Sequence, residues 1–415
     1  MTAPQARIGC LDLDTFFVSV ERLLDPSLAG RPVIVGGRPT DRGVVAACSY
    51  EVRARGVRSG MALRDAGRLA PDAVYLPPRH DTYGRYAAEV RAIAARFSPE
   101  IQVASIDEMY MSFAGCEGLY ARPGDRDGDA TIERTVRAMT GAIQRELGLP
   151  SSAGIAATRS MAKVASGLAK PAGVLLVPVG REAETLGPLP VRKLPGVGPV
   201  AEGKLRAMGI ETLGELAARP VADLRPVFGA WAEGMKRAAQ GDGANALGPE
   251  RPAFREHDVD GEVVGSISNE RTFTEDVRDP SVIEGMLCAL CERVAWRARK
   301  RGVKARTVTL KLRYADFQTL TRSRTLGVAT DADAEVQGVV AELYRTARTR
   351  RTRIRLLGVQ LSKLELAHQM ELAVDHATAG GRAVRPAVTS AVDDIRARFG
   401  YDAVRRAQGA RTGRF

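Results

Sequence analysis

Apolar and polar positions along the first 170 residues follow two periods, which predict alternating strands and helices. Strand-like alternation occurs in "RIGCLDLDTFFVSV" (7–20), "IQVASIDEMYMSFAG" (101–115) and "SSAGIAA" (151–157), the second of which predicts two short strands around a turn. Helical spacing occurs in "HDTYGRYAAEVRAIAARF" (80–97) and "ATIERTVRAMTGAIQREL" (130–147). This order predicts an α+β sheet domain with helices on one face.

From about residue 171 the pattern changes to short helices separated by Pro and Gly. "KLPGVGPVAEGKLRAMGIETLGELA" (193–217) predicts two short helices around a Gly-rich hairpin. Such a hairpin, here with Gly196 and Gly198, presents backbone N–H groups and a helix N-terminus that can bind phosphate without reading sequence. The alternative is an ordinary helical turn.

A polar, Gly- and Pro-containing stretch at 241–262 predicts a linker to a second unit. This unit has strand patterns at 265–273, 305–316, 319–326 and 353–364, and helical patterns at 281–300 and 333–350. In its central strand Val308, Leu310 and Leu312 alternate with polar and basic residues. Its polar face is a candidate DNA surface or simply a solvated sheet face; the basic residues assigned to it are Lys311, Arg313, Arg322 and Arg324.

Charge narrows the choice of partner. The 415 residues carry a formal net charge of +12, with a pI near 9.7. This excess favours nucleic acid first and an anionic membrane surface second, although a generally basic proteome would produce it too. The length suggests about three domains. The sequence shows neither an apolar run near the ~20 residues of a membrane helix nor a signal-peptide pattern, so we expect a cytosolic protein without a membrane partner.

Cysteines and acidic loops offer two metal sites that we reject. The five scattered cysteines are typical of reduced thiols, and Cys288 and Cys291 form a CxxC inside a helical pattern with no second CxxC, which favours packing over zinc. "PGDRDGDA" (123–130) resembles a calcium loop, but Ala130 and Val136 occupy the positions of its glycine and bidentate glutamate.

Carboxylates form the stronger candidate site. Asp107 and Glu108 are adjacent at the predicted turn, and alternation places Asp12 and Asp14 on one face of the first strand. If that strand lies beside the hairpin, the acids gather without histidine, and oxygen ligands alone favour Mg²⁺ or Mn²⁺. A P-loop motif does not occur in the sequence. The candidate phosphate donors are therefore Tyr50, Arg53, Lys163 and Lys170.

Five motifs occur in order: "DLDTFFVSVE", "GVVAACSYEVRARGVRSGM", "SIDEMYMSF", "GIAATRSMAKVASGLAKPAG" and "LPGVGP". Together they resemble the Y-family translesion DNA polymerases, most closely the polymerase IV (DinB) type, over roughly residues 8 to 365. The resemblance implies a right-hand, multidomain α+β fold. Its parts are a ferredoxin-like palm (1–24 and 73–170), small fingers (25–72), a helical thumb with a helix-hairpin-helix (171–248), a linker (249–261), an α/β little finger (262–366) and a basic C-terminal tail (367–415).

The resemblance also implies a two-metal centre. Asp12, Asp107 and Glu108 match the catalytic acids that hold two Mg²⁺ ions, which Mn²⁺ can replace, and the backbone carbonyl of Leu13 assists them. Asp14 is not a metal ligand in the family, which leaves it a structural role.

Nucleotide contacts follow from the same motifs. Tyr50, Arg53 and Lys170 match triphosphate-binding positions, and Phe16 and Phe17 match positions at the nucleotide. Phe17 corresponds to the steric gate, whose ring leaves no room for a ribose 2′-hydroxyl; the local alternative is that Phe17 belongs to the core. Thr15 departs from the family, because many relatives carry Ala, Cys or an aromatic residue there.

The implied function is error-prone, template-directed DNA synthesis in damage tolerance, by a cytoplasmic, nucleoid-associated and monomeric enzyme that binds primer–template DNA and dNTPs. The alternatives are a non-catalytic accessory protein, which would lack the three acids, and a nucleotide cyclase, which would not need the hairpin or the second unit. Many relatives bind the sliding clamp through Gln-x-x-Leu-Phe; "QMELA" (369–373) has Ala373 in place of the aromatic anchor, so it is a weak clamp motif.

Overall fold

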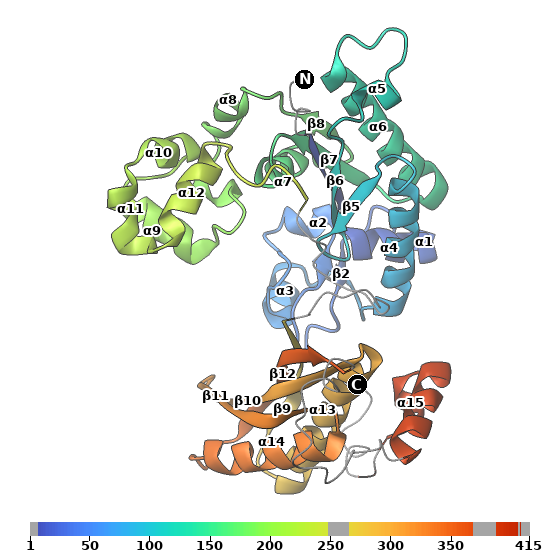
Figure 1. Ribbon diagram of the computed structural model, residues 1–415, viewed down its shortest axis with the longest axis vertical. Coiled ribbons are helices and arrows are strands. Elements are labelled where there is room, and N and C mark those ends of the chain that lie inside the picture. Colours follow the sequence, from blue (N-terminus) through green and yellow to red (C-terminus); the bar gives the residue numbers. More distant parts are fainter. Residues whose placement is uncertain (1–6, 248–264, 368–386, 406, 408–415) are drawn as a thin grey trace, which may run out of the picture. The chain divides into compact units, whose positions relative to one another are not determined.

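The computed structural model describes residues 7–247, 265–367, 387–405 and 407 (Figure 1). Its contacts divide the chain into two units, Met1–Phe254 and Arg255–Phe415. Both units are mixed α/β structures, as the sequence predicts. The expected linker at 249–261 and the "QMELA" stretch lie outside the described residues.

A five-stranded sheet forms the centre of the first unit. Its order is β5 (Glu100–Val103), β6 (Glu108–Ser112), β1 (Ile8–Leu13), β7 (Ser151–Ala156) and β8 (Val174–Leu176). All neighbours are antiparallel except β7 and β8, which are parallel. Since β8 follows residue 170, the palm sheet extends beyond the boundary expected from the sequence.

Helices cover both faces of this sheet, so the prediction of helices on one face is wrong. Leu11 and Leu13 pack into a core on the side of α1 (Phe16–Leu24), α4 (His80–Ala94) and α6 (Gly128–Leu147). Cys10, which alternates with them, packs with α7 (Arg159–Leu168) on the opposite side. A Cβ atom at Gly154 of β7 would lie 2.2 Å from the Ala162 carbonyl oxygen of α7. This close approach explains why a glycine occupies the position.

A separate three-stranded sheet lies mainly in the segment that is expected to form the fingers. Its order is β3 (Ala47–Cys48), β2 (Val33–Val35) and β4 (Val74–Leu76). The short helices η1 (Pro26–Leu28), α2 (Tyr50–Arg53) and α3 (Leu63–Leu69) complete this part, and α5 (Glu117–Tyr120) lies beside α6 in the palm. Because β4 pairs with β2, the finger sheet extends past residue 72.

The thumb segment is helical, as predicted. Its helices are α8 (Glu182–Leu186), η2 (Val191–Lys193), α9 (Pro199–Ala207), α10 (Leu213–Ala218), α11 (Val221–Phe228) and α12 (Trp231–Ala239). The hairpin pattern corresponds to α9, α10 and the turn between them, which contribute the fully buried Leu205, Leu213 and Ile210 respectively. A capping box between Thr212 and Glu215 begins α10 and stops the preceding turn from extending the helix.

The second unit has a four-stranded antiparallel sheet. Its order is β11 (Thr319–Thr330), β10 (Val303–Tyr314), β12 (Ile354–Leu366) and β9 (Ser266–Val277). Val308, Leu310 and Leu312 pack in one core with residues of α13 (Pro280–Lys300) and α14 (Asp333–Ala347). Cys288 and Cys291 are buried in α13, as expected for packing residues. Within the part of the chain that the structure describes, no helix combines the length and apolar character needed to cross a bilayer.

The strand register corrects the expected basic face. Arg322 pairs with Leu310 and Arg324 with Val308 across β11 and β10. Directly paired residues of antiparallel strands project to the same side, so both arginines lie on the helix side of the sheet. Arg324 accordingly forms an ion pair with Glu342 of α14. Lys311 and Arg313 project from the opposite, polar side, so the four residues do not share one face.

The last described helix, α15 (Ala387–Phe399), contacts α13 of the second unit through two ion pairs. Arg396 of α15 lies 3.4 Å from Glu292 of α13, and both side chains are almost fully buried. Asp393 accepts two hydrogen bonds from the guanidinium of Arg299, at 2.6 and 3.0 Å. η5 (Tyr401–Ala403) follows, with the ring of Tyr401 5.0 Å from that of Trp296. Part of the segment expected as a basic tail therefore contributes to the folded second unit.

Candidate active site

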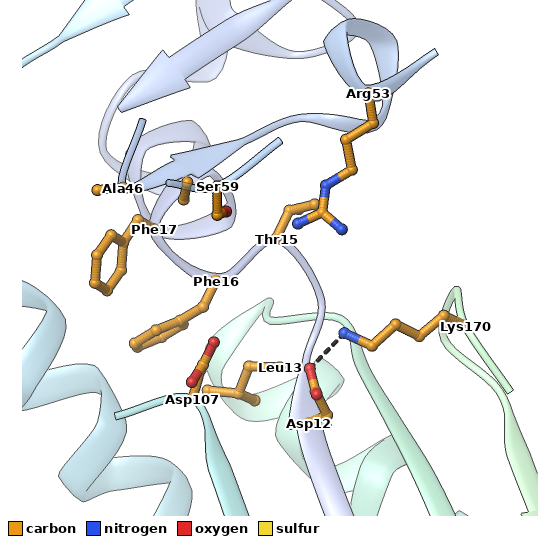
Figure 2. Close-up of a pocket in the computed structure, with 11 residues that line it drawn as sticks. Asp12, Leu13, Thr15, Phe16, Phe17, Ala46, Arg53, Ser59, Asp107 and Lys170 are labelled. Carbon is orange, nitrogen blue, oxygen red and sulfur yellow. Dashed lines mark hydrogen bonds and ion pairs between the residues drawn. The ribbon is translucent and has the colours of Figure 1, made fainter. Parts of the chain in front are cut away.

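A cavity of about 250 Å³ opens where β1 ends and α1 begins (Figure 2). It lies between the palm sheet and the fingers, and the residues around it come from four separate segments of the chain. The lining residues are Asp12, Leu13, Thr15, Phe16, Phe17, Ala46, Ala47, Arg53, Ser59, Asp107 and Lys170. Most of the residues expected at the nucleotide and the metals are thus brought together around one cavity.

Asp12 and Glu108 lie side by side because β1 and β6 pair in register at these two residues. Both carboxylates face α7, where Nζ of Lys163 lies 2.7 Å from Asp12 Oδ2 and 2.5 Å from Glu108 Oε2. Nζ of Lys170 also donates to Asp12 (Figure 2). Two ammonium groups therefore compensate the paired carboxylates.

Asp107 occupies the turn that precedes β6, and its backbone carbonyl accepts a hydrogen bond of 2.9 Å from the amide of Leu13. Its carboxylate lines the cavity and accepts a hydrogen bond from the Ser105 hydroxyl. Among the described residues, no three acidic, histidine or cysteine side chains are placed closely enough to form a metal-binding group. Of the three expected acids, two are adjacent and the third faces the same cavity from the turn.

Burial and neighbouring charges shift the pKa values of Lys163 and Cys10 beside the paired carboxylates. Burial by itself would lower the pKa of Lys163, but Asp12 and Glu108 outweigh it and hold the pKa above its usual value. Burial, followed by the charge of Glu108, raises the pKa of the Cys10 thiol to about 12. Cys10 therefore stays a neutral thiol beside the carboxylates at neutral pH in this arrangement.

Asp14 is almost fully buried and accepts three hydrogen bonds, from the Ser152 hydroxyl at 2.8 Å, the Ala172 amide at 2.7 Å and the Tyr50 hydroxyl at 3.3 Å. These donors tie β1 to β7, to the segment after α7 and to the fingers. This arrangement supports the structural role expected for Asp14.

Thr15 forms the tight turn between β1 and α1 with a φ of 45°, in the left-handed region. A β-branched residue is strained there, and such strain is concentrated at functional sites. Its hydroxyl lies 3.3 Å from that of Ser19 in the first turns of α1. Asp12, which precedes this turn, and Phe16, which follows it, both line the same cavity.

The fingers contribute a cation and a phenol. Arg53 lines the cavity, its Nε donates 3.2 Å to the Cys48 carbonyl, and its guanidinium lies 5.5 Å from the centre of the Tyr50 ring. Burial, with the charge of Asp14 second, raises the pKa of Tyr50 to about 12, so its hydroxyl remains a donor at neutral pH. Tyr50 itself is not among the residues that line the cavity, because its hydroxyl is turned to Asp14.

The chemistry of the donors, rather than their present spacing, suits a hard divalent cation. Carboxylate oxygens of Asp12, Glu108 and Asp107 and the nearby backbone of Leu13 are the oxygen-only ligands that Mg²⁺ prefers. The ammonium of Lys163 between Asp12 and Glu108 stands where a cation is required for charge balance. Lys163 was predicted only as a phosphate donor, and no sequence spacing indicated that it would bridge two acids.

The expected DNA contacts lie on separate elements. Gly196 has a φ of 92°, and Gly198 is the N-cap of α9 in the hairpin. On the polar face of the second unit, Lys311 forms an ion pair of 2.6 Å with Glu270, and Arg313 donates 2.9 Å to the Thr319 hydroxyl. Ser105, Ala46, Ala47 and Ser59 around the acids and the cavity were missed by sequence reasoning, since small residues carry no local signal.

Family models match most of the chain. Residues 11–167 match the impB/mucB/samB family, residues 264–374 match the C-terminal domain of that family, and residues 179–210 match the HHH motif of the IMS family. The last match covers the whole of α9 and the glycines before it, and it ends before α10.

Two relatives are similar in sequence to this chain over most of its length. The DNA polymerase IV of Dehalococcoides mccartyi strain CBDB1 is 36% identical over 399 residues, 96% of this chain and 96% of the relative. The DNA polymerase IV of Halorhodospira halophila is 38% identical over 359 residues, 86% of this chain and 94% of the relative.

Solved structures share the fold. A Y-family DNA polymerase chimera of Dbh and Dpo4 matches with a TM-score of 0.71 at 23% identity, over 87% of this chain and 99% of that one. An insertion ternary complex of Dbh DNA polymerase matches with a TM-score of 0.57 at 23% identity, over 86% and 98%. The family models and the long, closely matching relatives establish that this chain belongs to the impB/mucB/samB family of Y-family DNA polymerases, as a member of the polymerase IV (DinB) type.

Proposed function

We propose that this translesion DNA polymerase adds dNTPs to a primer 3′-hydroxyl at the cavity between palm and fingers. The observation that carries the proposal is the pairing of Asp12 with Glu108 beside that cavity, compensated by a lysine ammonium and faced by Arg53. A non-catalytic accessory role is not favoured, since Asp12 and Asp107 line the cavity and Glu108 pairs with Asp12 beside it.

Asp12, Asp107, Glu108 and the carbonyl of Leu13 would hold two Mg²⁺ ions, replaceable by Mn²⁺. When bound, these ions supply charge neutralisation and activation of the primer hydroxyl. Lys170 and Arg53 both line the cavity and carry positive charge, which suits them to orient an anionic triphosphate (Figure 2). Asp14 holds Tyr50 and the segment after α7 in place around them.

Both Phe16 and Phe17 line the cavity, and Phe17 is proposed as the steric gate because it is only partly buried, whereas Phe16 is almost fully buried. The hairpin around Gly196 and Gly198 is proposed to hold the DNA backbone through its N–H groups. We further propose that the enzyme acts as a monomer at the nucleoid. Clamp binding through 369–373 would require an interface without the aromatic anchor.

Primer extension on a labelled primer–template with Mg²⁺ and dNTPs tests the proposal. The wild type should extend the primer, and Asp107→Ala should lose about a hundredfold to a thousandfold in rate, as loss of one preorganised electrostatic contact does. Glu89→Ala, at an exposed position of α4, is the matched control and should extend normally. Extension by Asp107→Ala at the control's rate, or DNA binding without extension by the wild type, would reject this site.

A further inference from the structure

The ring of Phe17 rests on a second aromatic ring behind the cavity. Tyr83 of α4 stacks against it with ring centres 4.1 Å apart and planes inclined by 15°. His80, one turn earlier in α4, meets the Phe17 ring edge-on at 5.9 Å. Phe17 therefore lines the cavity while its ring stacks on α4, and the position of that ring depends on Tyr83.

Tyr83 is held by a buried acid. Its side chain is fully buried, and its hydroxyl donates a hydrogen bond of 2.6 Å to Oε1 of Glu21. Glu21 has only 1% of its surface exposed and lies one helical turn after Phe17 on α1. Its other carboxylate oxygen lies 3.6 Å from the half-exposed guanidinium of Arg79. Tyr83 of α4 thus contacts two residues of α1, Phe17 through its ring and Glu21 through its hydroxyl.

This contact set is not needed for packing alone. An apolar pair of similar volume would fill the same space without the desolvation of a carboxylate. What the polar pair adds is direction, because a short hydrogen bond to a charged acceptor fixes where the hydroxyl end of the Tyr83 ring lies. Stacking by itself tolerates sliding of one ring over another, since offset geometries are similar in energy.

We propose that Glu21 and Tyr83 are positioning residues for sugar selection: the Glu21 carboxylate holds the Tyr83 ring, and that ring holds Phe17 against the space of a ribose 2′-hydroxyl. The inference rests on the proposed function, with Phe17 as the gate. It concerns residues that do not touch the substrate and act only through the ring of Phe17.

The test compares kcat/KM for a dNTP and for the matching rNTP in single-nucleotide primer extension. Tyr83→Phe keeps the ring and removes the hydroxyl, and Glu21→Gln keeps an acceptor without the charge. The double variant Glu21→Leu/Tyr83→Phe removes both partners, so no buried polar group is left unsatisfied and the fold is retained. Tyr314→Phe, at a fully buried tyrosine of the second unit whose hydroxyl contacts the Ala347 carbonyl, is the matched control.

In Tyr83→Phe and in the double variant, kcat/KM for the rNTP should rise about threefold to tenfold, the effect of losing one hydrogen bond of ordinary net strength, while that for the dNTP changes little. Glu21→Gln should retain most of the selectivity, and Tyr314→Phe all of it. A merely destabilised enzyme would lose both activities together rather than gain one.

The variant Phe17→Ala distinguishes a failure of the positioning role from a failure of the gate assignment on which it rests. If Phe17→Ala abolishes sugar selection while Tyr83→Phe and the double variant keep wild-type selectivity, the positioning role is wrong. If Phe17→Ala itself leaves selection unchanged, the gate assignment fails instead. If the wild type does not incorporate dNTPs, the proposed function fails.

Discussion

Lys163 and Asp12 are 151 residues apart in the sequence, yet Nζ of Lys163 lies 2.7 Å from Oδ2 of Asp12. The same ammonium contacts Glu108, so a side chain of α7 neutralises two carboxylates on neighbouring strands. A cation is therefore part of the metal-free arrangement, and a divalent ion bound by these acids would compete with the lysine for the same oxygens.

Replacing Lys163 by Met should make the protein depend more strongly on Mg²⁺. Without the ammonium, Asp12 and Glu108 repel each other in the metal-free state, and Mg²⁺ relieves that repulsion. The rise in Tm on adding Mg²⁺ should exceed the wild-type rise by about 3 °C, the shift that ~1 kcal/mol produces in a unit of this size. Thermal unfolding with and without Mg²⁺ measures it, with Lys236→Met in α12 as control; equal Mg²⁺ responses in all three proteins would contradict the competition.

Lys311 and Arg313 should contribute to DNA affinity, and Arg324 should contribute less. The first two project from the polar face of β10, whereas Arg324 is paired with Glu342 on the helix side. Lys311→Ala/Arg313→Ala should reduce the slope of log K against log salt by about 1.8, since each phosphate contact contributes about 0.9. Fluorescence anisotropy in a salt titration measures the slope, and Arg324→Ala is the comparison. A larger loss for Arg324→Ala would place the DNA on the other side of β11.

Arg396→Ala should destabilise the second unit by about 3 kcal/mol, because it removes the guanidinium that forms an ion pair with the buried Glu292. Arg398→Ala, at an exposed position of the same helix, should change stability by less than about 0.5 kcal/mol. Urea unfolding followed by circular dichroism measures both. Equal stability of the two variants would mean that α15 does not contribute to the fold of this unit.

The contacts between α15 and α13 also decide how clamp binding should be tested. Deleting residues 367–415 would remove Asp393 and Arg396 together with the "QMELA" stretch and would leave the buried Arg299 without Asp393. Substituting Gln369 and Leu372 changes the motif alone and keeps α15 intact, so it is the cleaner experiment.

Stability should fall as the pH rises above about 9, in part through Cys10. The pKa of this thiol is raised by burial from 9.0 to about 12 in the folded protein, so the folded state binds the proton more tightly than the unfolded state. The stabilisation is complete below pH 9 and is lost as the pH rises toward 12. Cys10→Ala should flatten the dependence of Tm on pH between 9 and 11, and Cys116→Ala serves as a comparison. An unchanged pH profile in Cys10→Ala would contradict this contribution.

Local patterns along the chain were sufficient to predict most elements and the class of the fold. The alternation of Val308, Leu310 and Leu312 predicts β10 because a strand projects successive side chains to opposite faces. The spacing around Leu205 and Leu213 predicts α9 and α10 for a similar reason. The order of the acidic, basic and Gly-rich motifs was enough to predict the polymerase family. These features depend on residues that are close together in the chain, so sequence patterns are enough to predict them.

Other features depend on which distant segments meet, and only the tertiary structure decided them. The face of Arg324 follows from the register of β11 on β10, and a slip of one residue would reverse it. The bridge from Lys163 to Asp12 and Glu108 requires α7 to cover the second face of the palm sheet. The support of Phe17 by Tyr83 and Glu21 requires α4 to pack on α1. Such pairings depend on register and packing angle, which hydrophobic periodicity does not specify.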